Sequence, residues 1–200
     1  ASPLEHAQRK AIFDANMKEI IAHNRGPSSY KMGVNAFTAM TDDEFAASLG
    51  YDKNTQRKMH SLLTFREDDL KVKRDHPSEV DWTKRAFINT FNQGRCGSCW
   101  AHSAAVTVNA MAQISQGVAV NISRQAVVDC FVNEHQCGGS GGCQGATAQL
   151  AFDYIKENGV PFETEYPYVS GETTEAGVCR SKDFKTAVTV SGHYTVKPND

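Results

Sequence analysis

The chain has 200 residues, of which 40% are hydrophobic and 22% are charged, and its formal net charge is −2. This composition indicates a globular protein with one domain, or with one domain and an appended segment. Residues 1–75 carry 12 basic and 11 acidic side chains and residues 76–200 carry 9 and 12, so neither part has the excess of one sign that favours nucleic acid or an anionic membrane as a partner.

Residues 1–75 contain no cysteine, and their pattern predicts two helices followed by a linker. Apolar residues recur at near-helical spacing over residues 5–24, and Gly26 and Pro27 end the pattern. Residues 30–37 are expected to be extended. A second helix is expected after Thr41, because Glu44 three residues later completes a capping box. Residues 51–77 are polar and lack periodicity, which indicates an exposed linker that a protease can reach.

Residues 76–200 contain all six cysteines, between positions 96 and 179. We predict helices over residues 98–116, 123–129 and 147–158, with Gly117 and Gly159 ending the first and the last of them. Residues 186–196 alternate in polarity as a strand does. The grouping of the cysteines predicts a disulfide-stabilised domain preceded by a segment without disulfides. No run approaches the roughly 20 apolar residues of a membrane helix, so we expect no membrane span.

The stretch NQGRCGSCWAHS, residues 92–103, places Cys99 at the predicted start of a helix. A thiol at a helix N-terminus lies in the positive end of the helix dipole, which favours the thiolate and makes a nucleophile. Gly94 and Gly97 leave room for a substrate carbonyl. The side-chain amide of Gln93 and the backbone N–H of Cys99 are then placed to bind the oxygen of that carbonyl, as an oxyanion hole does. The pattern predicts nucleophilic attack on a carbonyl group.

This stretch closely resembles the nucleophile segment of papain-like cysteine peptidases, including the cathepsin L group. The resemblance extends over essentially the whole chain. EVDWTK at 79–84 resembles the start of the family's mature domain, SRQAVVDC at 123–130 and GCQGATAQLAFDYIKENG at 142–159 resemble two of its helical segments, and YPY at 166–168 lies where the family has it. Upstream, the family's two propeptide motifs are matched at Glu5, Arg9, Ile12, Phe13, Asn16, Ile20 and Asn24, and at Gly33, Asn35 and Phe37.

The resemblance implies an α+β, papain-like fold, here mainly its helical left domain, preceded by a helical inhibitory propeptide. The propeptide is expected to occupy residues 1–75, with a tail that crosses the active-site cleft and is cut near residues 74–76. The peptidase domain is expected to occupy residues 76–200.

The resemblance also assigns roles to individual residues. Cys99 is the implied nucleophile and Gln93 the implied oxyanion-hole side chain. The implied disulfides join Cys96 to Cys143 and Cys130 to Cys179. The implied substrate-binding residues are Gly97, Gln144, Gly145 and Ala146, with Thr147 and Ala148 on the wall of the main specificity pocket.

Several residues allow a second interpretation. A CxxC pair is also found in redox proteins and zinc sites, and a zinc set could be drawn from Cys96, Cys99, His135 and Cys137 or Cys143. Neither use explains Gln93 or the propeptide motifs, so we expect no metal and no cofactor. His102 is either a base for Cys99 or a packing residue at a position where the family usually has Phe. Asn121 begins a glycosylation sequon whose Ser123 could instead act only as a helix cap.

The chain departs from the family at four places. Ala39 stands where the second propeptide motif has Asp, a carboxylate associated with pH-triggered activation. Ala146 replaces a glycine of the substrate strip, and pairing with substrate is strained if that position needs a φ that only glycine adopts easily. Thr147 and Ala148 are small and indicate a roomy pocket. The loop over residues 131–142 is long and contains Cys137, which is left over after two disulfides and the nucleophile and is either free or paired outside this chain.

The family's catalytic His and Asn lie roughly 130–150 residues after the cysteine, and none of the seven histidines here lies in a matching motif. We therefore expect the chain to stop before the β-rich domain that bears them, and to be inactive alone.

The predicted function is that of a zymogen of a cysteine endopeptidase that hydrolyses peptide bonds through a Cys99 thioester. The alternative is a non-catalytic relative that acts as a structural or binding subunit. The expected partners are peptide substrates, the chain's own propeptide and the C-terminal remainder of the peptidase, in a secreted or lysosome-like compartment.

Overall fold

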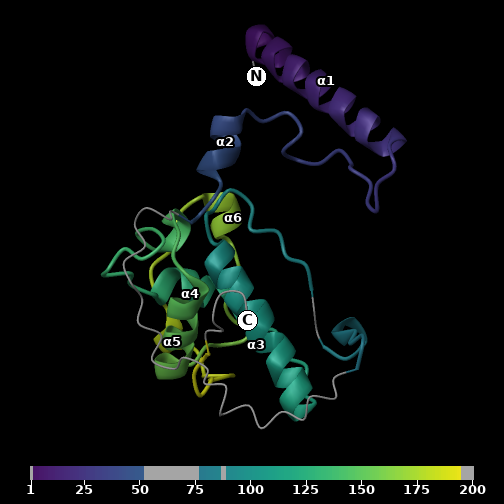
Figure 1. Cartoon of the computed structure of the whole chain (residues 1–200). Helices are drawn as coiled ribbons and strands as arrows, with labels where there is room; N and C mark the ends of the chain where they lie inside the picture. Colours follow the sequence, from purple (N-terminus) through teal and green to yellow (C-terminus); the bar gives the residue numbers. More distant parts are fainter. Residues whose placement is uncertain (1, 52–76, 87–88, 195–200) are drawn as a thin grey trace. The chain divides into compact units, whose positions relative to one another are not determined.

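The structure is a computed structural model that describes residues 2–51, 77–86 and 89–194 (Figure 1). It divides into two compact units, Ala1–Ser48 and Leu49–Asp200, here called unit 1 and unit 2. The expected end of the propeptide near residue 75 and most of the expected linker lie outside the described residues. Within the described ranges, no helix has the length and apolar character needed to cross a membrane.

Unit 1 contains two helices, α1 (Pro3–Arg25) and α2 (Asp42–Ala47). The side chain of Ser2 accepts a hydrogen bond from the backbone N–H of Glu5, and Pro3 occupies the first turn, where a missing N–H costs nothing. The predicted capping box of Thr41 and Glu44 is present at α2. The first helix and this cap are confirmed. Residues 31–35 form no regular element and a turn follows at 36–39, so the expected extended piece ends before Phe37.

Polar side chains hold the returning segment of unit 1 against α1. The side chain of Asn16 donates to the carbonyl of Thr38 (2.9 Å), and the side chain of Asn24 bonds both the N–H and the carbonyl of Met32 (2.8 Å each).

Arg9 donates to the carbonyl of Ala39 (3.1 Å) and forms an ion pair with Glu44. Hydrogen bonds from Arg9 and from the backbone of Thr41 lower the pKa of Glu44 to about 2.

Unit 2 is built around the helix α3 (Cys99–Gln116), which packs against α4 (Arg124–Cys130) and α5 (Ala148–Asn158), as Figure 1 shows. The short helix α6 (Ser170–Thr173) follows, and single 3₁₀ turns occur at Trp82–Lys84, Gly142–Gln144 and Ser181–Asp183. One face of α3 enters the core through its small and apolar residues, Trp100, Ala101, Ala104, Ala105 and Val108. These positions recur at helical spacing, so a single face of α3 is buried.

The three helices predicted for this unit are confirmed, with ends that differ by one residue. Gly117 ends α3 in the left-handed conformation, at φ 71°. The strand predicted at 186–196 is wrong over its described part, residues 186–194. Only Val188 pairs, through an isolated bridge with Val160, because no extended segment continues alongside it among the described residues.

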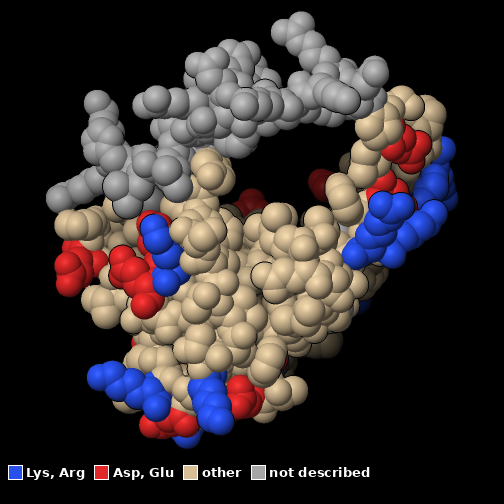
Figure 2. Space-filling view, turned by 90° about the horizontal axis from the view of Figure 1, so that it is seen from below, with Lys and Arg blue, Asp and Glu red and all other residues tan. Residues whose placement is uncertain are grey.

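Figure 2 shows one face of the molecule, on which acidic and basic side chains lie in small mixed groups around an area that carries neither kind. This distribution agrees with the near balance of 21 basic and 23 acidic residues in the sequence.

Candidate active site

Cys99 is the first residue of α3, at the positive end of the helix dipole. It is one of two free cysteines among the described residues, and its side chain is half-buried. Ser98 is the N-cap residue, but its side chain makes no capping bond to the helix backbone. The hydroxyl of Ser98 is engaged elsewhere, and the start of α3 is held by other contacts.

A disulfide and two hydrogen bonds tether the predicted substrate strip beside Cys99. Cys96 and Cys143 form one of the two disulfides implied by the family resemblance, with 4.6 Å between their Cα atoms, and Cys130 and Cys179 form the other. The N–H of Gly97 donates to the carbonyl of Cys143 (2.9 Å), and the indole of Trp100 donates to the carbonyl of Gly142 (3.2 Å). Residues 142–146 are thus fixed against the segment that leads into α3.

Three glycines pack against one another at this strip, and their backbones are too close together to leave room for a side chain. A Cβ atom placed on Gly145 would lie 1.4 Å from the carbonyl oxygen of Gly50, and one placed on Gly50 would lie 1.9 Å from the carbonyl oxygen of Gly97. Gly145 also has φ 90°, which side-chain-bearing residues rarely adopt. The segment around Gly50 therefore lies directly on the predicted substrate strip, and Gly50 is buried there.

Gln93 is held in a tight turn ahead of the nucleophile. Its side-chain amide donates to the carbonyl of Cys96 (2.9 Å), and its own carbonyl accepts from the hydroxyl of Tyr168 (2.8 Å). Gly94 follows with φ 64°, and a Cβ atom there would lie 2.4 Å from the carbonyl oxygen of Gly171. This close approach explains why glycine follows Gln93.

The replacement of glycine by Ala146 causes no backbone strain. Ala146 is not among the described non-glycine residues with positive φ, and its side chain is buried, so the strain considered from the sequence does not occur in this structure. Thr147 is buried beside it and Ala148 begins α5 half-buried. Their position on a specificity-pocket wall, and the size of that pocket, stay predictions.

The extra cysteine of the long loop is buried and outside the two disulfides. Cys137 is 5% exposed, and Asn133 holds its backbone by accepting from its N–H (3.1 Å) and donating to its carbonyl (3.0 Å). Each zinc set considered from the sequence includes Cys96, whose sulfur is bonded to that of Cys143. The described residues hold no group of three or more His, Cys, Asp or Glu side chains that could bind a metal.

His102 packs inside unit 2. Its Nδ1 atom lies 3.0 Å from the carbonyl of Ser98 and 3.3 Å from the Ser98 hydroxyl, and its ring meets Tyr168 edge-on with 4.7 Å between centroids. Burial lowers the pKa of His102. These contacts fit a packing residue better than a base. The contact of His102 with Tyr168 was not predicted, because the two residues lie far apart in the sequence.

The glycosylation sequon at Asn121 stays a prediction. Its Ser123 caps α4 by accepting from the N–H of Ala126 (2.9 Å), and the Ser123 hydroxyl donates to the carbonyl of Tyr166 (2.6 Å). Ser123 is fully buried, and the carbonyl oxygen of the Asn121 side chain is buried without a hydrogen-bond partner.

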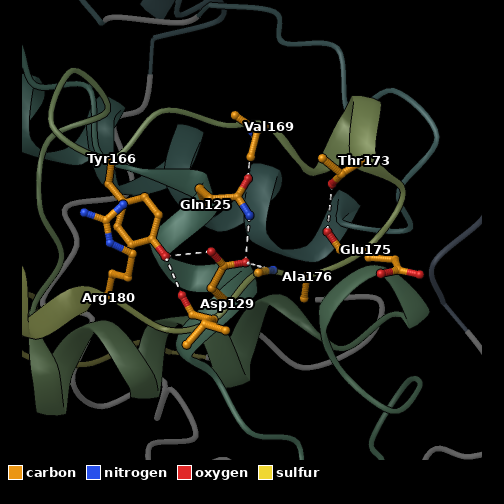
Figure 3. A pocket seen from close by; sticks show the side chains of 10 residues that line it. Gln125, Asp129, Tyr166, Val169, Thr173, Glu175, Ala176 and Arg180 are labelled. Carbon is orange, nitrogen blue, oxygen red and sulfur yellow. Dashed lines mark hydrogen bonds between the residues drawn. The ribbon is translucent and has the colours of Figure 1, made fainter.

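Figure 3 shows a cavity of about 350 Å³ in unit 2 whose lining does not include Cys99 or Gln93. Its main polar groups bond one another: Asp129 accepts from the side chain of Gln125 (2.6 Å), the hydroxyl of Tyr166 (2.7 Å) and the N–H of Gly177 (2.7 Å). These bonds join α4 to the chain around α6, which gives the cluster a structural role.

Two protein families match the chain. Residues 76–200 match the papain family of cysteine proteases, and residues 1–45 match the cathepsin propeptide inhibitor domain. Among curated proteins, the probable cysteine protease RDL3 of Arabidopsis thaliana is 37% identical over 98% of this chain and 51% of its own length. Human cathepsin L2 is 34% identical over 97% of this chain and 56% of its own length. The chain thus spans about half the length of these curated relatives.

Solved structures show the same relationship. A digestive procathepsin L2 proteinase from Tenebrio molitor larval midgut matches with a TM-score of 0.77 and 28% identity, over 96% of this chain and 61% of that one. The ragweed pollen allergen Amb a 11, a cysteine protease in its proform, matches with a TM-score of 0.75 and 31% identity. The match covers 96% of this chain and 56% of the allergen. The predicted fold, a papain-like left domain preceded by a propeptide, is confirmed, and the chain belongs to the papain family of cysteine proteases.

Proposed function

We propose that this chain is the N-terminal portion of a cysteine endopeptidase zymogen in which Cys99 is the nucleophile. The observation that carries the proposal is the position of Cys99, a free thiol on the first residue of α3 beside a strip tethered by the disulfide Cys96–Cys143. Cys99 lies at the positive end of the helix dipole, and the glycines of the neighbouring strip allow another backbone to approach closely.

The reaction would proceed in two stages. The sulfur of Cys99 attacks the carbonyl carbon of a peptide bond, and the carbonyl oxygen becomes an oxyanion that accepts from the Gln93 side chain and the Cys99 N–H. Collapse of this intermediate breaks the C–N bond, and the leaving amine takes a proton. Water then attacks the thioester on Cys99, which releases the carboxylic acid and restores the thiol.

The proton carrier for these steps is proposed to come from the remainder of the protein, since RDL3 and human cathepsin L2 are nearly twice as long as this chain. Two of the described histidines are engaged elsewhere. His102 contacts Ser98 and Tyr168, and His193 lies against Asp153 (3.4 Å) on α5. The paired imidazole is needed both to take the proton of the thiol and to give one to the leaving amine.

The propeptide is proposed to inhibit by occupying the substrate strip. Residues 1–45 match an inhibitor family, and the chain immediately after them places Gly50 against Gly97 and Gly145. A substrate backbone would need the same space. The protein is further proposed to act in an oxidising compartment, either outside the cell or in a lysosome-like organelle, because two disulfides stabilise the catalytic unit.

The test compares two cysteine variants of the complete native product that contains this chain, after removal of the propeptide. We expect Cys99→Ala to abolish cleavage of a fluorogenic peptide amide. The control is Cys137→Ala, which removes the other free thiol and should retain activity within about twofold, because Cys137 contacts its own loop.

An inactive wild-type product with an intact fold would contradict the proposal and favour a binding subunit. Equal activity of wild type and Cys99→Ala would also contradict it, because the nucleophile would then be another group.

A further inference from the structure

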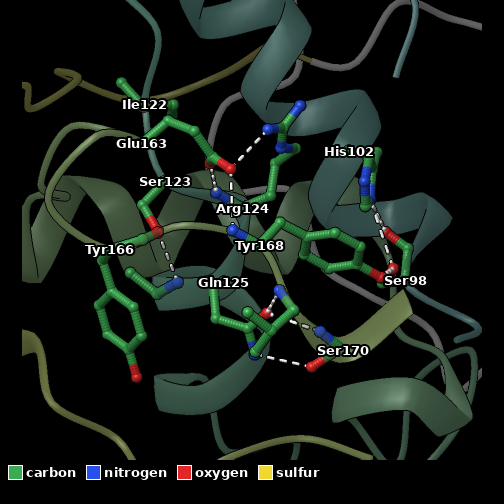
Figure 4. A network of polar contacts seen from close by, with 12 residues as sticks. Ser98, His102, Ile122, Ser123, Arg124, Gln125, Glu163, Tyr166, Tyr168 and Ser170 are labelled. Atoms are coloured by element: carbon green, nitrogen blue, oxygen red, sulfur yellow. Dashed lines mark hydrogen bonds and ion pairs between the residues drawn. The ribbon is translucent and has the colours of Figure 1, made fainter. Parts of the chain in front are cut away.

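A polar cluster of Ser98, His102 and Tyr168, with Tyr168 half-buried, lies next to the first residues of α3 (Figure 4). Ser98 is fully buried, and His102 is 9% exposed. The three side chains contact one another: the hydroxyls of Ser98 and Tyr168 are 2.6 Å apart, and the ring of His102 lies against both residues. Buried polar groups of this kind need defined partners, so the direction of each hydrogen bond matters.

The carbonyl groups of Gln93 and Ser98 fix the direction of the bonds that they accept. The carbonyl of Gln93 can only accept, so the Tyr168 hydroxyl, 2.8 Å away, donates to it. The Ser98 hydroxyl is then assigned as the donor to the oxygen of Tyr168, 2.6 Å away, because its other acceptor, the carbonyl of Cys96, lies at 3.5 Å. The carbonyl of Ser98 can also only accept, so Nδ1 of His102, 3.0 Å away, carries a proton and donates. The hydroxyls of Ser98 and Tyr168 therefore form a one-way chain that ends on the carbonyl of Gln93. The Nδ1–H of His102 points at the Ser98 carbonyl and lies 3.3 Å from the Ser98 hydroxyl, at the start of that chain.

Each end of this chain holds one of the two proposed oxyanion-hole donors. Tyr168 holds the backbone of Gln93, whose side chain is the first donor. His102 holds the carbonyl of Ser98, which belongs to the same peptide group as the N–H of Cys99, the second donor. That carbonyl also accepts from the N–H groups of Ala101 (3.0 Å) and His102 (3.1 Å). Hydrogen bonding to a peptide carbonyl polarises the N–H at the other end of the same group.

We propose that Tyr168 and His102 are positioning residues for the oxyanion hole, joined through the hydroxyl of Ser98. This inference rests on the proposed function and extends it to residues that do not touch the reacting atoms. It also accounts for the imidazole at position 102. Nδ1 donates to the carbonyl of Ser98, while Nε2 is buried without a hydrogen-bond partner in the described structure. A neutral ring, favoured by burial, tolerates this arrangement better than a charged one.

The first experiment measures the tautomer of His102 from the ¹⁵N shifts of its imidazole in the complete native product. We expect the Nδ1–H form, whether or not the protein is active. The Nε2–H form would overturn the proposal, because Nδ1 could then not donate to Ser98.

The second experiment is a set of double-mutant cycles on the processed enzyme. Tyr168→Phe removes only the hydroxyl, and we expect kcat to fall about tenfold with KM changed less than about twofold, below the roughly 10²–10³ of losing a whole donor. In a Gln93→Ala background, Tyr168→Phe should cost less than about twofold more, because the donor it positions is already absent. His102→Phe should lower kcat about threefold in either background, since it acts on the Cys99 N–H.

The matched control is Tyr166→Phe, which removes a hydroxyl bonded to Asp129 (2.7 Å) and to the carbonyl of Val178 (3.2 Å), away from the site. It should leave kcat unchanged although it removes buried hydrogen bonds. An unchanged kcat in Tyr168→Phe, or a loss that adds fully to that of Gln93→Ala, would overturn the proposal. An inactive wild type would instead refute the proposed function. The tautomer of His102 would then still test the direction of the hydrogen bonds in the cluster.

Discussion

Among single residues, Arg124 and Glu163 form the most buried ion pair of the described part of the chain. Their charged atoms are 2.6 Å apart, and their side chains are only 7% and 13% exposed. Glu163 also accepts from the backbone N–H groups of Arg124 (3.2 Å) and Tyr168 (2.9 Å), and the Arg124 guanidinium lies 3.6 Å above the ring of Phe91. The pair thus joins α4 to the segment that carries Tyr168.

We predict that Glu163→Gln lowers the free energy of unfolding by about 3 kcal/mol, because it leaves a buried guanidinium without its counter-charge. Urea unfolding of the oxidised protein, followed by the fluorescence of buried Trp100, measures this loss in unit 2. The control is Asp183→Asn, which breaks the exposed pair with Arg180 (3.1 Å) and should cost less than about 1 kcal/mol. Similar losses in the two variants would show that burial does not govern the strength of these pairs.

Sequence reasoning singled out the residues whose proposed role depends on a local pattern or a family motif. Cys99 and Gln93 lie in one short stretch, and the structure places both at the start of α3 or just ahead of it. The contacts of Tyr168 with Ser98 and Gln93 span 70 and 75 residues, so no local pattern predicts them. The YPY motif marked this position, but only the folded chain shows what its second tyrosine bonds.

At the scale of elements, the helices were predictable because caps and apolar spacing act within a few residues. The Thr41 and Glu44 capping box begins α2, and Gly117 ends α3 in the left-handed conformation. The absence of a strand at 186–196 was not predictable in this way, because alternating polarity gives a strand only where a partner strand runs alongside. Val188 meets only Val160, and the segment otherwise stays irregular over its described residues.

The segment around Gly50 gives a prediction at this scale. We expect Gly50→Ala to loosen inhibition, because its Cβ would lie 1.9 Å from the carbonyl oxygen of Gly97, and overpacking costs about 1–3 kcal/mol. The rate at which iodoacetamide alkylates Cys99 in the unprocessed protein should rise about fivefold or more, in line with that cost.

Gly26→Ala serves as the control for this variant. Gly26 has φ −79°, and its nearest contact to a Cβ would be an ordinary 3.4 Å, so the substitution fits without strain. An alkylation rate in Gly50→Ala equal to that of Gly26→Ala would show that Gly50 does not shield the nucleophile.

At the scale of the whole molecule, the two units are stabilised differently. Unit 1 relies on polar side chains that bond backbone groups, whereas unit 2 has a core of helices and two disulfides. The disulfides close loops of 47 and 49 residues, which in the chain-entropy model stabilise the fold by about 4 kcal/mol each. The helical core and the disulfides hold Cys99 and its strip within unit 2.

Cys99 is proposed to form a thioester with substrate, and trapping that intermediate tests the proposal most directly. The processed native product would be mixed with an activated peptide ester, quenched in acid within milliseconds to seconds, and mapped by tandem mass spectrometry. We predict one acyl group per molecule on Cys99, which the fragment spectrum separates from Cys96 after reduction. An acyl group on another residue, or product release without any acyl-protein, would contradict the assignment of Cys99 as the nucleophile.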